Sequence, residues 1–452
     1  MTLILSSSIF GPSFSEPQAA ALLSDEAYFR ALLEVEVALG RAQAELGIIP
    51  AAAADAIAHA AAALPFEPAT LAAGVARDGV PIVALVGRLR AALDPAHAPY
   101  VHWGATSQDI IDTATVSMAR RVLAVIDGAV HALLRRLAEL AREHRHTLMA
   151  ARTHAQQALP TTFGLKLAGW ALPLVRHRER LRELLPRLGV VQLGGAAGTQ
   201  LALGPRAAEL SRGFARVLGL GTVELPWHSQ RDSIAELGSW LGLLTGSLGK
   251  LAQDVILMCQ SEVAELGEAP HGQRGGSSSM PQKNNPMRSE QMLAAARAVA
   301  GHGGALMGAL VQEHERGTHG WQLEWLSLSP MLLLTAGAAS NARALLTDLV
   351  VYAERMRSNL LSNHGLALAE PAVLALSEHL PRPEASALVT ASAARALAEG
   401  RSLVDVVREA FEQKHGTGRV DFARLARPEL QLGCAHELLD AALARIDADL
   451  LR

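Results

Sequence analysis

Apolar positions in the middle of the chain recur at helical spacing over long stretches that contain no proline. Residues 107–147 hold apolar side chains every three or four positions, from Ile110 to Leu140, with no proline and a single glycine. The stretches 226–270 and 286–330 also have no internal proline. These patterns predict helices of about 40 residues, which would be about 60 Å long. Helices of this length are typical of a bundle in which several helix faces are buried.

Prolines are more frequent on both sides of this central region, and they predict shorter helices there. We therefore expect an N-terminal helical domain over 1–103, a central long-helix bundle over 104–350 and a C-terminal helical domain over 351–452. Aromatic residues make up only 4% of the chain and β-branched runs are short, so sheets are not expected and the predicted fold class is all-α. A bundle of this size buries further surface by association, which predicts a homo-oligomer.

Composition narrows the possible classes of protein. Half of the 452 residues are apolar, which is enough for a large core. The net charge of −3 does not indicate the basic surface that nucleic-acid binding requires. The two cysteines, Cys259 and Cys434, are far apart and fit neither a disulfide framework nor a cysteine zinc site. No basic residue precedes the short apolar stretch at the N-terminus, and no run of 18 apolar residues occurs. We expect a soluble cytoplasmic protein without a membrane partner.

A polar segment interrupts the apolar pattern just before the first long helix. Residues 101–109 read Val-His-Trp-Gly-Ala-Thr-Ser-Gln-Asp, and either Thr106 or Ser107 is a natural N-cap. Free N–H groups and small hydroxyls at a helix start favour a carboxylate or phosphate. Helix capping alone is the simpler interpretation of this segment.

Two further polar segments lie where helices are expected to begin. Residues 152–157 place Arg152, His154 and Gln156 within a short stretch, and residues 226–232 read Pro-Trp-His-Ser-Gln-Arg-Asp. Both combine donors and titratable groups that could contact an anionic ligand. A capped turn with solvated side chains explains 152–157 equally well, and a loop with an N-cap is the simpler interpretation of 226–232.

The segment 275–286 carries the strongest indication of chemistry. It reads Gly-Gly-Ser-Ser-Ser-Met-Pro-Gln-Lys-Asn-Asn-Pro, and it offers a flexible backbone, a cation at Lys283 and an amide at Asn285. A linker needs neither the lysine nor the Met-Pro pair, and the phosphate-loop pattern is absent. Only four of the 41 basic residues are lysines, so a lysine here is informative. We interpret this segment as an active-site lid.

The lid sequence GSSSMPQKNNP resembles the signature loop of the fumarase/aspartase superfamily. The segments HWGATSQDIIDTA, LPTTFGLKLAGW, QLGGAAGT, PWHSQRD and QEHERGTHGWQLEW look most like its lactonising branch, which belongs to the protocatechuate arm of the β-ketoadipate pathway. That resemblance implies conversion of the tricarboxylate 3-carboxy-cis,cis-muconate to 4-carboxymuconolactone through an aci-carboxylate intermediate. It also implies a three-domain helical protomer, a homotetramer with a twenty-helix core, active sites shared by three subunits, and no metal or organic cofactor.

The resemblance further implies roles for individual residues. Ser277 or Ser278 is the expected proton donor, and Ser277 is favoured, although the motif does not separate adjacent hydroxyls. Lys283 and Asn285 are expected to bind carboxylate oxygens, and Glu290 to orient a histidine or the lysine. The remaining implied site residues, which hold a second carboxylate or complete the pocket, are His102, Thr106, Ser107, Arg152, His154 and Gln156.

Some features leave other functions open. Related loops often read MPHKRNP, whereas this chain has Gln282 and Asn284, and His154 stands where C–N lyases carry a catalytic histidine. An adenylosuccinate lyase-like β-elimination therefore remains an alternative, although residues 77–80 lack the histidine that purine lyases present there. A non-catalytic structural role, as in lens crystallins of this superfamily, is disfavoured by the intact lid.

Overall fold

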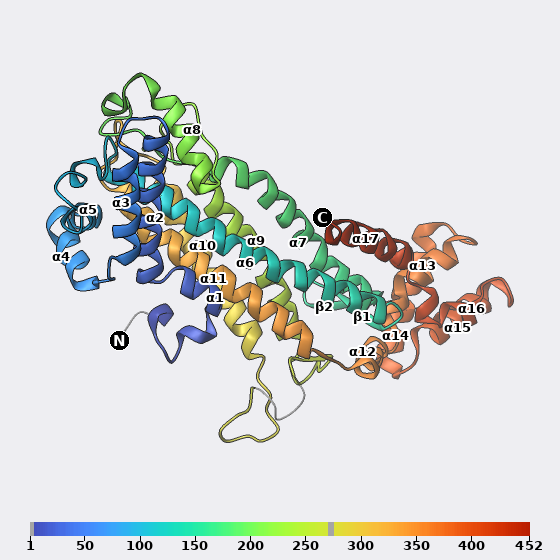
Figure 1. Ribbon diagram of the computed structural model, residues 1–452. Helices are drawn as coiled ribbons and strands as arrows, with labels where there is room; N and C mark the ends of the chain where they lie inside the picture. Colours follow the sequence, from blue (N-terminus) through green and yellow to red (C-terminus); the bar gives the residue numbers. More distant parts are fainter. Residues whose placement is uncertain (1–3, 270–274) are drawn as a thin grey trace. The chain divides into compact units, whose positions relative to one another are not determined.

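Long α-helices dominate the structure, a computed structural model that describes residues 4–269 and 275–452 (Figure 1). The predicted all-α fold is confirmed. The five longest helices are α6 (Ser107–Glu143), α7 (Phe163–Leu188), α9 (Asp232–Met258), α10 (Met287–Gly308) and α11 (Gly320–Asp348).

Shorter helices precede, connect and follow these five. Those before or between them are α1 (Pro17–Leu22), α2 (Asp25–Glu45), α3 (Ala51–Ala63), α4 (Pro68–Asp78), α5 (Ile82–Ala91) and α8 (Ala207–Leu218). Those after them are α12 (Ala353–Leu361), α13 (Ala369–Ser377), α14 (Arg382–Glu399), α15 (Leu403–His415), α16 (Phe422–Leu425) and α17 (Ala435–Leu450). The strands are β1 (Leu148–Thr153), β2 (Gln156–Thr162), β3 (Leu266–Gly267) and β4 (Val350–Val351).

The structure agrees with only part of the prediction of three helices of about 40 residues each. Helix α6 spans 37 residues, close to the prediction, while α9 spans 27. The prediction of one helix over 286–330 is wrong, because α10 ends at Gly308 and α11 starts at Gly320 and continues through Pro330. A proline inside a helix costs about 3 kcal/mol. Burial of the adjoining Met331 and Leu332 offsets that cost.

The chain forms two compact units that are discontinuous in sequence. The first contains the chain up to residue 130 together with 177–249 and 291–340. The second contains 131–176, 341–452 and the described part of 250–290. All five long helices contribute residues to both units. The division into three continuous domains therefore stays a prediction.

The first unit has a core in which α2 is central. Figure 1 shows α2 beside α3, with α5 and α8 close to them, and the contacts between these helices agree. Their shared interior contains fully buried side chains from each helix, among them Phe29, Leu39, Ile57, Leu85 and Phe214. The polar segment before α6 lies against this core, since Val101 belongs to it.

The long helices of the first unit pack closely where small residues and buried polar groups allow it. A Cβ at Gly238 of α9 would lie 2.2 Å from the side chain of Leu306 in α10, so only glycine permits this contact. The indole of Trp240 in α9 donates a hydrogen bond of 2.8 Å to the carbonyl of His177 in α7. These contacts hold α9 against α10 and α7.

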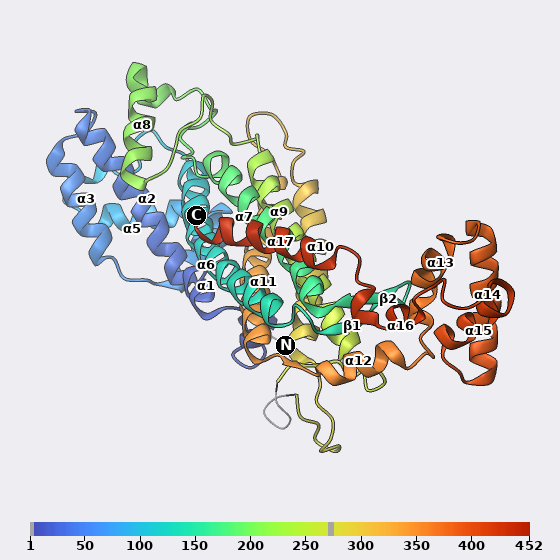
Figure 2. The ribbon, with the colours of Figure 1, turned by 90° about the vertical axis from the view of Figure 1, so that its right-hand side faces the viewer.

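The second unit contains two small antiparallel sheets and a C-terminal helical cluster. Strands β1 and β2 form a hairpin, and β3 pairs with β4. Helices α13, α14 and α15 pack together around Leu376, Val389 and Phe411 (Figure 2). The short strands lie outside the sequence prediction, which expected no sheets.

Helix α9 is, by length and composition alone, apolar enough to cross a membrane. Half of its most apolar window is buried inside the protein. Core helices of soluble proteins have the same length and composition, so these two properties assign no location to α9.

Candidate active site

The polar segment before α6 forms a capped helix start in the first unit. Helix α6 begins at Ser107, which makes Thr106 the N-cap. The carboxylate of Asp109 accepts a hydrogen bond of 2.9 Å from the backbone N–H of Thr106, as in a capping box. Gly104 has a positive φ of 75°, and a Cβ there would lie 2.3 Å from Leu203. The turn that presents Thr106 and Ser107 therefore depends on glycine at 104.

Asp109 holds this turn in place from inside the core. Its buried carboxylate also accepts hydrogen bonds from the backbone N–H groups of Gly194 (2.8 Å) and Gly195 (2.9 Å). The Nε2 of buried His228 lies 2.8 Å from Asp109 Oδ1. Asp109 is therefore fully used in positioning the helix start and is not free to contact a ligand.

Arg316, which is not among the predicted site residues, contacts the same helix start. Arg316 donates a hydrogen bond of 2.9 Å to the Thr106 hydroxyl and one of 3.3 Å to the Gln108 side chain. It places a guanidinium beside the free N–H groups of the helix start, where an anion is favoured. Arg316 lies in the segment QEHERGTHGWQLEW, whose resemblance was noted without assigning a role to the arginine.

His102 in this segment is paired with a buried carboxylate. Its Nδ1 lies 2.6 Å from Oε1 of Glu36 in α2, and Glu36 is only 2% exposed. Burial by itself lowers the pKa of His102, but the charge and the hydrogen bond of Glu36 outweigh it, so the pKa is raised above the usual value. Asp109 also raises this pKa, and Arg90 lowers it. A protonated His102 would be a cation suited to a substrate carboxylate.

In the second unit, the segment 152–157 forms the tip of the β1–β2 hairpin. Thr153 pairs with Gln156, and the two residues between them, His154 and Ala155, have positive φ values of 47° and 64°. A two-residue turn of this kind usually contains asparagine or glycine. His154 and Gln156 are both exposed at this tip.

Arg152 on this hairpin is oriented by the buried carboxylate of Glu265, which directly precedes β3. Its two terminal nitrogens donate hydrogen bonds of 2.9 and 2.6 Å to the oxygens of Glu265, whose side chain is fully buried. Asn359 donates a further hydrogen bond of 2.9 Å to Glu265. The guanidinium of Arg152 thus has a fixed direction, and both of its terminal nitrogens are engaged within the chain.

The lid, residues 275–286, is closed at its base by backbone contacts in the second unit. Asn285 donates from its backbone N–H (2.8 Å) and from its side-chain amide (3.0 Å) to the carbonyl of Gly275. Gly275 has a φ of 74°, and a Cβ there would lie 2.3 Å from the Asn285 carbonyl oxygen. Asn285 therefore has a loop-closing contact in addition to its predicted role toward the substrate.

Within the lid, Ser277 is distinguished by its contacts. Its Oγ accepts hydrogen bonds from the backbone N–H groups of Ser279 (3.3 Å) and Met280 (3.2 Å). Ser278 and Lys283 are exposed, as is Glu290 in the first turn of α10. N–H donors aimed at one hydroxyl oxygen stabilise negative charge on it.

The predicted site residues thus fall into three groups. His102, Thr106 and Ser107 share the turn before α6 in the first unit. In the second unit, Arg152, His154 and Gln156 share the hairpin, and the lid with α10 carries the rest. Among residues 4–269 and 275–452, no cluster of three or more histidine, cysteine or acidic side chains could hold a metal ion.

Comparisons with known proteins extend over almost the whole chain. A family model described as a lyase matches residues 13–301. The 3-carboxy-cis,cis-muconate cycloisomerase of Pseudomonas aeruginosa is 41% identical over 98% of this chain and 97% of its own. The nitrosuccinate lyase of Streptomyces davaonensis is 38% identical over 99% of this chain and 96% of its own. The crystal structure of the 3-carboxy-cis,cis-muconate lactonizing enzyme from Pseudomonas putida has a TM-score of 0.91 at 35% identity, covering 98% of this chain and all of that one.

Proposed function

The chain belongs to the fumarase/aspartase superfamily of lyases, and on this premise we propose that it catalyses the lactonisation of 3-carboxy-cis,cis-muconate to 4-carboxymuconolactone. The observation that carries this function is the near full-length likeness, in sequence and in fold, to enzymes of that name. The reaction belongs to protocatechuate breakdown through the β-ketoadipate pathway.

The chemistry requires a proton donor and several anion-binding groups. One substrate carboxylate adds to a carbon–carbon double bond and forms the lactone C–O bond, while a proton is delivered to the carbon α to another carboxylate. The intermediate carries additional negative charge on that carboxylate, so donors fixed in advance lower its free energy. A tricarboxylate substrate therefore needs cations and N–H groups on several sides.

Ser277 is the proton donor in this proposal, and its alkoxide acts as the base in the reverse direction. The backbone N–H groups of Ser279 and Met280, which donate to its Oγ, support this assignment. An ordinary alcohol transfers a proton poorly near neutral pH, so the alkoxide needs such stabilisation. Ser278, which is exposed and adjacent, remains the alternative donor.

Carboxylate binding is divided among the three groups of residues. In the lid, Lys283 and Asn285 hold one carboxylate, and closure of the lid excludes water from the intermediate. At the start of α6, Thr106 and Ser107 hold a second carboxylate with the help of the helix dipole. Protonated His102 supports this second position.

The hairpin supplies the remaining contacts of the proposed site. Arg152 and Gln156 line the pocket, and His154 at the hairpin tip is a titratable group within reach of the reacting atoms. Glu290 orients a histidine or Lys283. The exposure of His154, Gln156 and Lys283 in the single chain supports a site that other subunits complete.

We propose that the complete enzyme is a homotetramer with a twenty-helix core, in which each active site draws on three subunits. Large apolar side chains are exposed along the long helices and the α10–α11 connection, and association would bury them. The most exposed of these are Leu243, Leu257, Met307, Val311 and Leu326.

The proposed setting is the cytoplasm, with the small tricarboxylate as substrate and no nucleic-acid or membrane partner. Both cysteines are free thiols, in agreement with a reducing compartment. The net charge of −3 supports the absence of a polyanionic partner.

A β-elimination on a succinyl-type substrate is the second candidate function. The 38% identity to a nitrosuccinate lyase over nearly the full chain favours it. His154, in the position of the catalytic histidine of adenylosuccinate lyase-like enzymes, favours it as well. Elimination and lactonisation share the same requirement for donors around a carboxylate intermediate.

An ultraviolet assay separates these functions. Purified protein mixed with 3-carboxy-cis,cis-muconate is expected to remove the conjugated-diene absorbance without any added metal. Nitrosuccinate and adenylosuccinate, tested in parallel, are expected to react much more slowly. Rapid elimination from either of them, with no loss of the diene absorbance, would overturn the proposed function in favour of the second candidate.

A further inference from the structure

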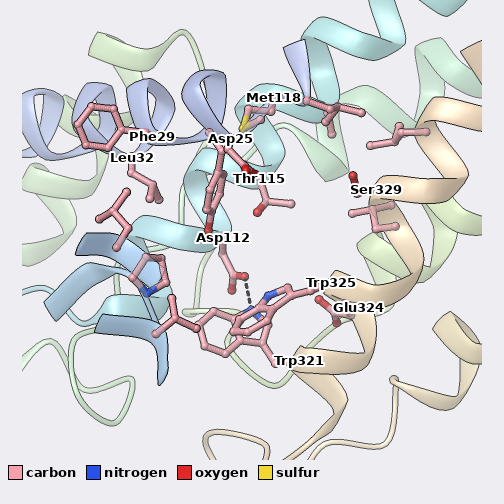
Figure 3. A pocket seen from close by; sticks show the side chains of 18 of the residues that line it. Asp25, Phe29, Leu32, Asp112, Thr115, Met118, Trp321, Glu324, Trp325 and Ser329 are labelled. Atoms are coloured by element: carbon pink, nitrogen blue, oxygen red, sulfur yellow. Dashed lines mark hydrogen bonds between the residues drawn. The ribbon is translucent and has the colours of Figure 1, made fainter. Parts of the chain in front are cut away.

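The first unit contains a cavity of about 530 Å³ that none of the predicted site residues lines. Its walls come from α2, α4, α6 and α11. Figure 3 shows Phe29 and Leu32 on one side of it, Trp321 and Trp325 on the other, and Asp112 and Thr115 between them. This volume lies within the usual range for sites that bind small molecules.

Aromatic side chains provide most of the shape of the cavity. Phe29 and Phe66 lie with ring centroids 5.5 Å apart, and Trp321 and Trp325 form an edge-to-face pair at 4.7 Å. Trp325 is 37% exposed, although its ring is large and apolar. A flat apolar molecule between these two pairs would bury surface on both sides and make ring–ring contacts.

The charged groups at the cavity disfavour an anionic ligand. Arg231 lines the cavity, but its guanidinium is engaged on every nitrogen: it donates to Asp112 at 2.7 and 3.1 Å and to Glu324 at 2.8 and 2.5 Å. Its fifth N–H points to the carbonyl of Trp227 at 3.5 Å. Asp25, Asp112 and Glu324 also line the cavity, so carboxylates outnumber the one saturated cation. The tricarboxylate substrate is therefore not its ligand.

Tyr28 contributes a hydroxyl that is available to a ligand. The side chain lines the cavity and is half-buried, and burial together with the nearby charge of Asp112 raises the pKa of its phenol. The hydroxyl therefore stays neutral. Within the described part of the chain, no hydrogen bond of this hydroxyl is formed. A ligand in the cavity can therefore form a hydrogen bond with it.

We propose that this cavity is a second binding site, which takes an uncharged aromatic molecule with one hydrogen-bonding group directed at Tyr28. The aromatic walls select a flat apolar body, and the excess of carboxylates around the saturated Arg231 excludes anions. This site is separate from the proposed reaction, so its test does not depend on activity.

Isothermal titration calorimetry of the full-length protein with indole and with indole-3-carboxylate tests the charge selection. Indole is expected to bind at least tenfold more tightly than the carboxylate, which adds a negative charge to the same ring system. Tyr28→Phe is expected to weaken indole binding about fivefold, in line with the loss of one hydrogen bond. Tyr100→Phe, a change at a tyrosine that does not line the cavity, is expected to leave binding unchanged.

A matched pair of substitutions on α4 tests the location. Ala72 lines the cavity and its neighbour Ala73 does not, and both are exposed, so a tryptophan at either position is compatible with folding. Ala72→Trp is expected to abolish indole binding, and Ala73→Trp to leave it within twofold of wild type. Equal binding by these two variants, equal affinity for indole-3-carboxylate, or no heat of binding in the wild type would each overturn the proposal. A crystal structure in which a neighbouring subunit fills the cavity would also overturn it.

Discussion

Ser277 differs from the two serines that follow it because its hydroxyl oxygen accepts hydrogen bonds within the lid. Its Oγ accepts two backbone N–H groups, which is the arrangement that an alkoxide requires. We expect Ser277→Ala to lower kcat for the lactonisation about 100- to 10,000-fold, the usual range for loss of a general acid or base. Loss of the diene absorbance under saturating substrate measures this.

The neighbouring serines provide the comparison. Ser279→Ala changes an exposed hydroxyl in the same lid and is expected to keep kcat near the wild-type value. If Ser278→Ala carries the large loss instead, Ser278 is the proton donor. If neither Ser277→Ala nor Ser278→Ala lowers kcat, the serine mechanism is wrong.

In the proposed mechanism, Glu36 affects substrate binding through His102, and this effect depends on pH. The carboxylate keeps the pKa of His102 above its ordinary value, which favours the protonated imidazole. Glu36→Gln removes this charge and lowers the pKa of His102. We expect KM to rise roughly tenfold near pH 7.5, because a charge-assisted contact is lost, while kcat changes less. The rise in KM is expected to shrink as the pH falls and His102 regains its proton.

Glu34→Gln is the matched control for that experiment. Glu34 lies on the same helix but is exposed and pairs with Arg121 on the surface, so its loss is expected to leave the pH dependence of KM unchanged. An identical pH dependence of KM in wild type and Glu36→Gln would contradict the positioning role. The same linkage makes the His102–Glu36 pair stabilise the fold below the ordinary pKa of histidine, and this contribution is lost as the pH rises through the raised value.

At the scale of elements, the shape of the lid depends on its base. Gly275 has a φ of 74°, which residues other than glycine rarely adopt. Its backbone also lies so close to the Asn285 carbonyl that there is no room for a Cβ. Gly275→Ala is expected to open the hydrogen bonds that close the lid and to lower kcat/KM at least tenfold. The melting temperature is expected to change little, because the lid is largely exposed. Steady-state kinetics and thermal unfolding measure the two effects.

Gly276→Ala separates backbone strain from a general effect of substitution in the lid. A Cβ at Gly276 would have no atom within 4 Å, and the φ of Gly276 is not positive. The Gly276→Ala variant should therefore retain near wild-type kcat/KM. Equal losses in the two variants would show that the lid does not depend on the base at Gly275.

Elements whose signals are local could be predicted from the sequence. The start of α6 at Ser107 was expected because Thr106 and Ser107 are N-cap residues at the beginning of a long apolar period. The β1–β2 hairpin was missed because its turn residues, His154 and Ala155, adopt positive φ values without the glycine or asparagine that usually indicates such a turn. Pro330 predicts a helix boundary by its residue type, but α11 continues through it because tertiary packing stabilises the helix there.

At the scale of the whole molecule, the partners of the predicted site residues could not be predicted. Glu36 lies 66 positions from His102, and Glu265 lies 113 positions from Arg152. No periodicity or spacing connects residues this far apart, because only the packing of the helices and the hairpin brings them together. The residues proposed to contact a substrate can therefore be chosen from the sequence, whereas the buried carboxylates that orient them cannot.

A site assembled from several subunits makes a prediction that a site within one chain does not. His154→Gln on the hairpin and Ser277→Ala in the lid are each expected to be nearly inactive. In a tetramer whose sites take the hairpin from one subunit and the lid from another, random mixing of these two variants restores both intact groups at about a quarter of the sites. We therefore expect about a quarter of wild-type turnover after the two variants are unfolded, mixed and refolded together.

Mixing Ser277→Ala with Lys283→Met is the control, because both changes lie in the lid and every site then keeps one defect. Recovery of activity in the first mixture, with none in the control, supports active sites shared between subunits. If the first mixture refolds to tetramers and recovers no activity, the hairpin and the lid of each site lie on the same chain.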